Sequence, residues 1–130
     1  MSSPADLRYT KEHEWARVES DGVVTIGITD HAQDALGDVV YVELPEAGES
    51  FDVDAKFGVV ESVKTVSDLF APMAGTVVDV NAALEDAPEL VNSEPYGAGW
   101  MIRIEPSDAD AINGLMDAAA YEAHVDAESA

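Results

Sequence analysis

The chain of 130 residues carries 27 acidic and only 6 basic side chains, which gives a formal net charge of −21 at pH 7. A surface this negative repels phosphate backbones and anionic lipid headgroups, so we expect no binding to nucleic acid or to membranes. The length suits a single domain over residues 1–130, with a core over about residues 7–125 and flexible ends.

Cysteine and long apolar segments are both absent from the sequence. No stretch reaches the roughly 20 apolar residues of a membrane span, and residues 1–10 do not have the basic start and apolar stretch of a signal peptide. We therefore expect a cytoplasmic protein. Without cysteine the chain has no disulfide, no thiolate metal ligand and no thiol of its own, so any sulfur chemistry must come from an attached group.

The acidic residues are scattered among valine-rich segments instead of forming one tail, which predicts a folded chain. At about 1 M salt the Debye length falls to roughly 3 Å, short enough to screen the repulsion between these acids. The acid surplus and the presence of only three lysines, Lys11, Lys56 and Lys64, predict a protein from a halophilic prokaryote. The same charge favours a monomer at low salt.

Short strands dominate the first two thirds of the chain. Residues 15–19 and 23–29 are predicted strands, and the Asp21-Gly22 turn between them indicates a β-hairpin. The segment from Thr29 to Gly37 is predicted as a short helix with Asp30 as its N-cap. Further strands are predicted over residues 39–44, 56–62, 66–71 and 76–80. Because these strands follow one another too closely for helical crossovers, we expect an antiparallel sandwich or barrel.

Helical signals increase toward the C-terminus. Asn81 is a predicted cap of a brief helical turn over residues 82–85, and residues 100–104 alternate like a half-buried strand with Met101 and Arg103 on its outer side. Ser107 is a predicted N-cap. The helix after it would present one apolar face formed by Ala111, Ile112, Leu115, Met116 and Ala119. Gly114 weakens this helix, and residues 126–130 are expected to fray.

Isolated polar residues provide no catalytic or metal-binding pattern. The histidines are His13, His31 and His124, and no two of them have the spacing that places both on one helical face. We therefore expect each to be exposed or structural, and we expect no metal site. Neither Ser62 nor Ser67 lies in a nucleophile-elbow sequence, so the chain is not expected to be an enzyme.

One lysine stands between two valine- and phenylalanine-bearing strands, and by itself Lys64 could be an ordinary exposed lysine in a turn. The attachment motif around it, however, resembles the lipoyl-attachment hairpin of glycine cleavage system H proteins, a family of lipoyl carriers. This motif consists of Glu61, Ser62, Val63, Lys64, Ser67 and Asp68. The framing glycines of lipoyl and biotinyl domains, sixteen residues before and eleven after the modified lysine, are matched by Gly48 and Gly75.

The resemblance covers roughly residues 7–125, with further similar segments in the same order. These are residues 9–15, 27–33, 42–45, 80–81 and 92–100. This sequence differs from the family at Thr65-Val66, where the family commonly has smaller residues. The difference bears on how a modifying ligase recognises the turn.

The resemblance implies a mainly β fold, the barrel-sandwich hybrid of lipoyl domains, with short helices and a C-terminal helical segment. It also implies a carrier rather than an enzyme: lipoate in amide linkage to Lys64 would supply the missing dithiol. Lipoate ligase or lipoyl transferase would attach it. The arm would carry the aminomethyl group of glycine from glycine decarboxylase (P protein) to aminomethyltransferase (T protein) and would be reoxidised by lipoamide dehydrogenase (L protein).

The same resemblance implies a surface cleft for the arm near Glu14, His31 and Asp68, where carboxylates would pair with an aminomethyl cation. The alternative is that Glu14 and Asp68 are two of many surface acids. Three other functions remain open from the sequence. They are a biotin carrier, although Val63 and Thr65 replace the methionines usual in that class, an H-like lipoyl relay to other lipoate-dependent enzymes, and a small acidic interaction module with no prosthetic group.

Overall fold

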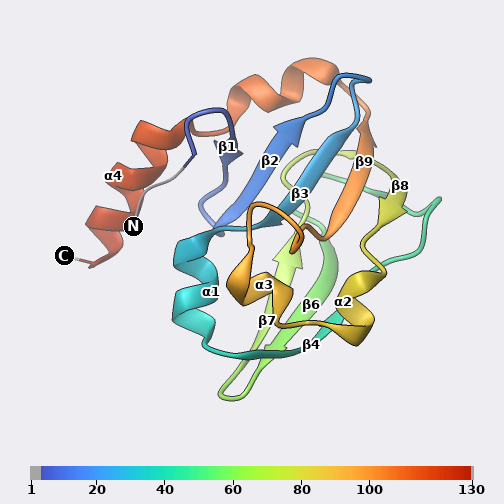
Figure 1. Ribbon diagram of the computed structural model, residues 1–130. Coiled ribbons are helices and arrows are strands. Elements are labelled where there is room, and N and C mark those ends of the chain that lie inside the picture. The colour runs from blue at the N-terminus through green and yellow to red at the C-terminus, as the bar shows by residue number, and fades with distance from the viewer. Residues whose placement is uncertain (1–3, 130) are drawn as a thin grey trace.

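Two antiparallel sheets form the body of the protein in a computed structural model that describes residues 4–129 (Figure 1). The six-stranded sheet has the order β1 (Arg8–Tyr9), β2 (Glu14–Val18), β3 (Val24–Ile28), β9 (Ile102–Pro106), β8 (Gly75–Val80) and β5 (Ser50–Phe51). The three-stranded sheet has the order β4 (Val39–Glu43), β6 (Lys56–Ser62) and β7 (Val66–Phe70). The prediction of a mainly β, antiparallel fold is confirmed. Of the chain ends predicted to be flexible, residues 1–3 and 130 lie outside the described residues.

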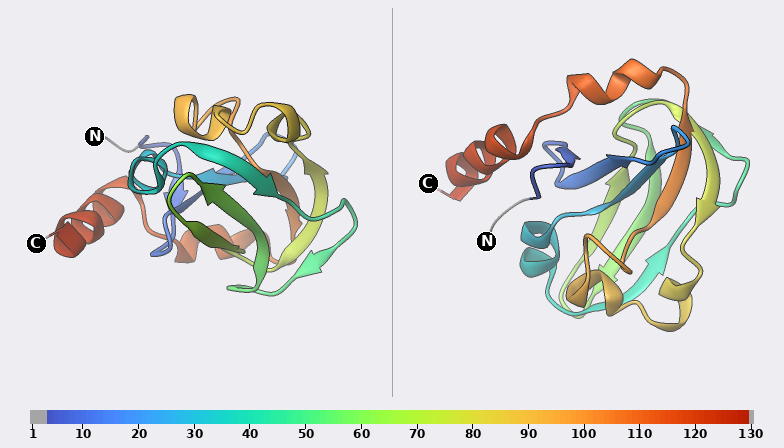
Figure 2. Two further views of the ribbon diagram at one scale, coloured as in Figure 1. Left: turned by 90° about the horizontal axis from the view of Figure 1, so that it is seen from below. Right: turned by 45° about the horizontal axis from the view of Figure 1, so that its top comes forward.

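Two local hairpins organise these sheets. Strands β2 and β3 pair with Val18 opposite Val24, and Gly22 in the turn has a φ of 87°, which confirms the hairpin predicted from Asp21-Gly22. Strands β6 and β7 pair with Glu61 opposite Val66, so Lys64 lies in the connecting turn. Seen from the tip of this second hairpin, the three-stranded sheet lies across the larger sheet (Figure 2, left).

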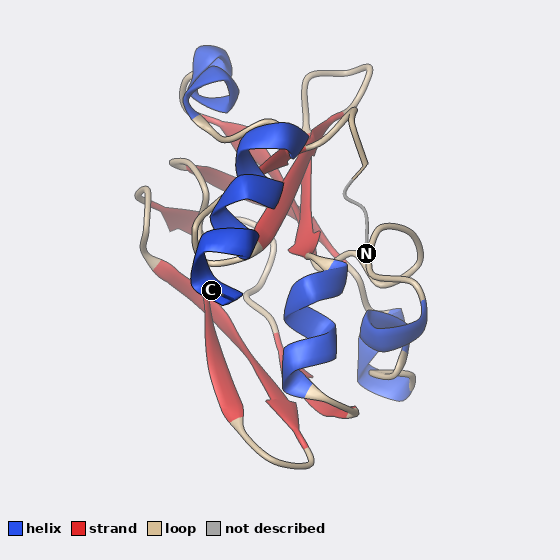
Figure 3. Ribbon diagram, turned by 90° about the vertical axis from the view of Figure 1, so that its left-hand side faces the viewer, coloured by secondary structure: helices blue, strands red, loops and turns tan. Residues whose placement is uncertain are grey.

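Helices cover one end and one side of the sheets (Figure 3). They are α1 (Asp30–Leu36), α2 (Ala83–Asp86), α3 (Leu90–Ser93), the 3-10 helix η1 (Ala109–Gly114) and α4 (Ala118–Ser129). Within residues 4–129, none of these is long and apolar enough to cross a membrane.

The N-cap of α1 is Thr29 and not Asp30 as predicted. The hydroxyl of Thr29 accepts a hydrogen bond from the backbone N–H of Ala32 at 3.2 Å, whereas Asp30 is the first helical residue. Asp30 instead accepts a hydrogen bond from Gln33 Nε2 at 2.7 Å, and its charge faces the positive end of the helix. The helix ends at Gly37 as expected.

The C-terminal region differs most from the prediction. The single helix expected after Ser107 is wrong, because η1 stops at Gly114 and Met116 instead forms a β-bridge with Tyr9. Asp108, not Ser107, caps η1, since its carboxylate accepts a hydrogen bond from Asp110 N at 2.9 Å. The second helix, α4, runs through residues 126–129 that were expected to fray.

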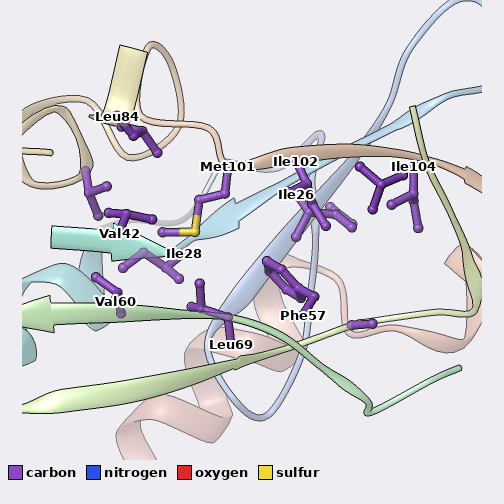
Figure 4. Packing of buried hydrophobic residues seen from close by; sticks show 14 of the residues in the cluster. Ile26, Ile28, Val42, Phe57, Val60, Leu69, Leu84, Met101, Ile102 and Ile104 are labelled. Carbon is purple, nitrogen blue, oxygen red and sulfur yellow. The ribbon is translucent and has the colours of Figure 1, made fainter. Parts of the chain in front are cut away.

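The strand predicted over residues 100–104 is also shifted, because β9 begins at Ile102. Met101 is fully buried, although the alternation predicted it on the outer side. Its backbone N–H donates to the carbonyl of Ile26 at 2.8 Å, and its side chain points between the two sheets (Figure 4). Buried Asn81 accepts a hydrogen bond from Ala83 N–H at the start of α2 at 3.3 Å, although the N-cap position itself is Ala82. Its Nδ2 also donates to the carbonyls of Ala98 and Trp100 at 2.7 Å.

The main core lies between the two sheets and is built almost entirely from aliphatic side chains (Figure 4). Its buried members include Ile26, Ile28, Val42, Phe57, Val60, Leu69, Met73, Leu84, Met101, Ile102 and Ile104. A second cluster of Leu7, Tyr9, Trp15 and Tyr121 attaches α4 to strands β1 and β2. The packing of two sheets around this apolar core thus holds the β6–β7 hairpin in place.

Candidate functional site

The turn around Lys64 is shaped by one serine side chain. Ser62 Oγ accepts hydrogen bonds from the backbone N–H groups of Lys64 at 3.3 Å and Thr65 at 3.1 Å. The Ser62 N–H also donates to the carbonyl of Thr65 at 2.8 Å, which closes the turn. Serine hydroxyls stabilise turns in this way, so Ser62 replaces the Asn-Gly or Asp-Gly pair usual at tight hairpins. Its local role is the reason that turn rules alone did not locate this turn.

Lys64 is exposed at the tip, and within residues 4–129 its ammonium group forms no ion pair. Its stem lies beside the end of α1, where a β-carbon on Gly37 would be 3.4 Å from Lys64 Cε. The neighbouring Val63 is 68% exposed and its N–H donates to the carbonyl of Asp38. The hairpin therefore presents an accessible primary amine on a backbone held from both sides.

Other residues of the attachment motif follow the hairpin. Glu61 lies opposite Val66 and Ser67 opposite Val60 in the β6–β7 ladder. Asp68 is exposed, and its carboxylate lies 3.3 Å from Lys56 Nζ. Lys56 and Lys64 therefore differ in environment, because only the former has a carboxylate partner among the described residues.

The framing glycines lie outside the hairpin and have two different structural reasons. Gly75 begins β8 opposite Pro106, where a β-carbon would lie 2.7 Å from the carbonyl oxygen of Glu105. Gly48 has a φ of 99° in the loop before β5, with no atom within 4 Å of the β-carbon position. Position 75 requires glycine because the neighbouring backbone approaches closely, and position 48 favours glycine because of its positive φ.

We expect Gly75→Ala to lower the free energy of unfolding by about 1–3 kcal/mol through overpacking. Gly48→Ala is expected to lower the free energy of unfolding by about 1–2 kcal/mol, because at positive φ a β-carbon lies too close to the carbonyl oxygen of the same stretch of backbone. Urea unfolding measures both. Gly114→Ala is the matched control, since Gly114 has open space and no positive φ, and we expect no loss of stability there. A Gly75→Ala protein as stable as the parent would contradict the packing argument.

A cavity of about 330 Å³ opens beside the hairpin, between α1 and β7. All three residues predicted for the arm cleft lie in its wall: Glu14 at the start of β2, His31 in the first turn of α1 and Asp68 in β7. Its apolar wall consists of Ile28, Ala32, Ala35, Leu36, Val60, Val66 and Leu69. The cavity includes Thr65 and therefore begins next to Lys64.

Glu14 is a buried acid, with 2% of its surface exposed, and not one of the many surface acids. The Thr10 hydroxyl donates to Glu14 Oε1 at 2.7 Å, and the Phe70 N–H donates to Oε2 at 3.3 Å. Burial raises the pKa of Glu14 to about 7, and these two hydrogen bonds offset only part of that effect. Near neutral pH the Glu14 carboxyl group is therefore present in both its protonated and its ionised form.

The three histidines lie together, although their spacing in the sequence gave no sign of this. The ring of His13 lies with its centroid 4.8 Å from that of His31 and 5.8 Å from that of His124. Glu128 in the last turn of α4 joins them, with Oε2 2.9 Å from His13 Nε2. Burial lowers the pKa of His13, and the adjacent Glu128 carboxylate acts in the opposite direction. We name His13, His31, His124 and Glu128 the histidine cluster.

Sequence reasoning missed Glu128 and Tyr121 as neighbours of this site. The Tyr121 hydroxyl lies 2.8 Å from His13 Nδ1 and 2.7 Å from Thr29 Oγ1, so it connects α4 to the cap of α1. No motif or periodicity links these residues, because they come from opposite ends of the chain.

Known proteins with similar sequence or structure extend over nearly the whole chain. The family model described as glycine cleavage H-protein matches residues 7–128. A glycine cleavage system H protein from a Psychrobacter species is 56% identical over 94% of this chain and 97% of its own length. The one from Halorhodospira halophila is 57% identical over 92% of each chain. A crystal structure of a glycine cleavage system H protein from Mycobacterium marinum is 42% identical, with a TM-score of 0.88, and the match covers 95% of this chain and 99% of that one.

Proposed function

Since the chain belongs to the glycine cleavage H-protein family, which consists of carrier proteins and not of enzymes, we propose that it is a lipoate-bearing shuttle of glycine cleavage with lipoate on Lys64. The observation that carries the proposal is the exposed Lys64 amine at the tip of a braced hairpin, beside the cavity between α1 and β7. When bound, lipoate supplies the dithiol that a chain without cysteine does not have.

The residues around Lys64 fit such a group. The Lys64 amine has no carboxylate partner among the described residues, and the Ser62 hydroxyl accepts hydrogen bonds from the backbone of the turn that presents it. The apolar wall formed by Ile28, Leu36 and Leu69 suits an aliphatic arm, because burying apolar surface there is favourable. Deeper in the wall, Glu14 in its ionised form would pair with a cationic amine.

The role in glycine cleavage has three enzyme partners and one modifying activity. The chain would receive the aminomethyl group from glycine decarboxylase (P protein), deliver it to aminomethyltransferase (T protein) and be reoxidised by lipoamide dehydrogenase (L protein). Lipoate ligase or lipoyl transferase would modify Lys64, and the place of action would be the cytoplasm. A lipoyl relay to other enzymes would use the same hairpin, so only the partner reaction separates the two roles.

Intact-mass analysis after incubation with lipoate ligase, ATP and lipoate tests the attachment. We expect a mass gain of one lipoyl group per chain, mapped to the peptide that contains Lys64. The lipoylated chain is then given to glycine decarboxylase, and glycine-dependent exchange of labelled bicarbonate is measured. Exchange that requires the lipoylated chain supports glycine cleavage. A chain that accepts lipoate but supports no exchange would overturn that role in favour of the relay.

A further inference from the structure

We propose that His13, His31 and Glu128 form a binding site for one zinc ion beside the cavity wall. One ligand atom from each residue lies within 4.8 Å of the other two. His13 precedes β2, His31 lies in the first turn of α1, and Glu128 lies in the last turn of α4. These segments are far apart in the sequence, and the fold brings the end of α4 beside α1 (Figure 3).

The donor set of two imidazoles and one carboxylate is a common one for zinc. Zinc ligands about 2.0–2.2 Å from the ion lie roughly 3.3–3.5 Å apart in a tetrahedron, somewhat closer than the 4.8 Å limit of this group. Glu128 can move the short distance needed to bring the three ligand atoms around one ion, because its side chain is 45% exposed and lies on the last helical turn. His13 Nε2 and Glu128 Oε2 lie 2.9 Å apart, a hydrogen-bond distance, so these two atoms would separate slightly to admit the ion.

The surrounding hydrogen bonds orient these ligands as a metal site requires. Without an ion, the 2.9 Å contact between His13 Nε2 and Glu128 Oε2 holds a proton. Zinc would take the place of this proton, and His13 Nδ1–H would then donate to the Tyr121 hydroxyl, whose O–H donates onward to Thr29 Oγ1. His124 Nε2 lies 3.5 Å from the other carboxylate oxygen of Glu128 and orients that group. Tyr121, which contacts His13, and His124, which contacts Glu128, both lie in α4.

The backbone of His13 provides a second, separate observation. Its φ is 69°, an uncommon conformation for a residue with a β-carbon. Backbone hydrogen bonds hold it there: His13 N–H donates to the carbonyl of Thr10 at 3.1 Å, and the His13 carbonyl accepts from Thr29 N–H at 3.0 Å. Such strained positions concentrate at functional sites, and here the strain accompanies an imidazole placed between His31 and Glu128.

Zinc at this site would tie α4 to the loop before β2 and to α1. Because the ion binds the folded chain and the three ligands separate on unfolding, binding would raise the unfolding temperature. Three protein ligands also leave one of four coordination positions open. His13 and His31 both line the cavity, so the ion would lie at the cavity wall.

Isothermal titration calorimetry with zinc tests the site on the full-length Lys64→Arg chain, freed of any polyhistidine tag. This chain has neither cysteine nor an attachment point for lipoate, so no thiol contributes, and the result does not depend on the proposed carrier role. Concentrated KCl screens diffuse binding to the acidic surface. We expect one zinc per chain and a higher unfolding temperature with zinc than without it.

His31→Asn and Glu128→Gln in this background are expected to weaken zinc binding by at least about 10-fold and to remove the rise in unfolding temperature. Asp126→Asn is the matched control, because it removes the same charge from the exposed surface of α4 two residues away, and it should bind zinc as the parent does. Prior addition of Ca²⁺, which prefers all-oxygen ligands, should leave the zinc isotherm unchanged. Equal zinc binding by all four proteins, or no zinc binding by the parent, would overturn the proposal.

Discussion

Replacing Lys64 with arginine is expected to abolish carrier activity completely while leaving the fold unchanged. Arginine keeps the positive charge, but its guanidinium group stays protonated in proteins and offers no free amine for an amide bond. Lys64 is exposed and has no ion pair among the described residues, so the free energy of unfolding should change by no more than about 0.5 kcal/mol. Intact mass after ligase treatment and glycine-dependent bicarbonate exchange measure the two parts of this prediction.

Lys56→Arg is the matched control for that experiment. Lys56 is also exposed and lies on the same hairpin, but its ammonium group faces Asp68, and arginine can keep that ion pair. The Lys56→Arg chain should gain one lipoyl group and support exchange as the parent does. A mass gain in the Lys64→Arg chain would show that the lipoyl group is attached elsewhere.

The second large effect concerns pH. The pKa of Glu14 rises from the ordinary 4.5 to about 7 on folding, which corresponds to roughly 3 kcal/mol. Between these two values the folded chain holds a proton that the unfolded chain has released, so the contribution of Glu14 to stability falls as pH rises through this window. Above about pH 7 the full cost of the buried charge is present.

Glu14→Gln should therefore stabilise the protein above pH 7 by up to roughly 3 kcal/mol and have little effect below pH 4.5. The glutamine amide can donate to the Thr10 hydroxyl, and its oxygen can accept from Phe70 N–H, so neither partner is left unpaired. Urea unfolding from pH 4.5 to 8.5 in concentrated KCl measures the difference. Glu105→Gln removes an exposed carboxylate on β9 that does not act on Glu14, so it is the control and should follow the parent curve. Parallel curves for Glu14→Gln and the parent would show that the carboxyl is not destabilised by burial.

Local signals predicted much of the fold. The hairpin through Asp21-Gly22 and the strands on either side of Lys64 appear where alternation and turn residues indicated, because both depend on neighbours within a few residues. The prediction of a single C-terminal helix failed because this region depends on contacts between residues far apart in the sequence. Its apolar spacing ran across Gly114, and the bridge between Met116 and Tyr9, residues from opposite ends of the chain, outweighs local helical periodicity.

The sequence by itself determined the positions of the main strands, the acidic composition and, through the order of its motifs, the family and the lysine on which the carrier role depends. Only the tertiary structure decided which polar residues share a site. Buried Glu14 accepts a hydrogen bond from Phe70 N–H of a distant strand, and the histidine cluster depends on α4 packing against β1 and β2 so that Glu128 reaches His13. Periodicity describes which face of one element a residue occupies, whereas these contacts join separate elements, and their geometry arises only when the sheets and helices pack together.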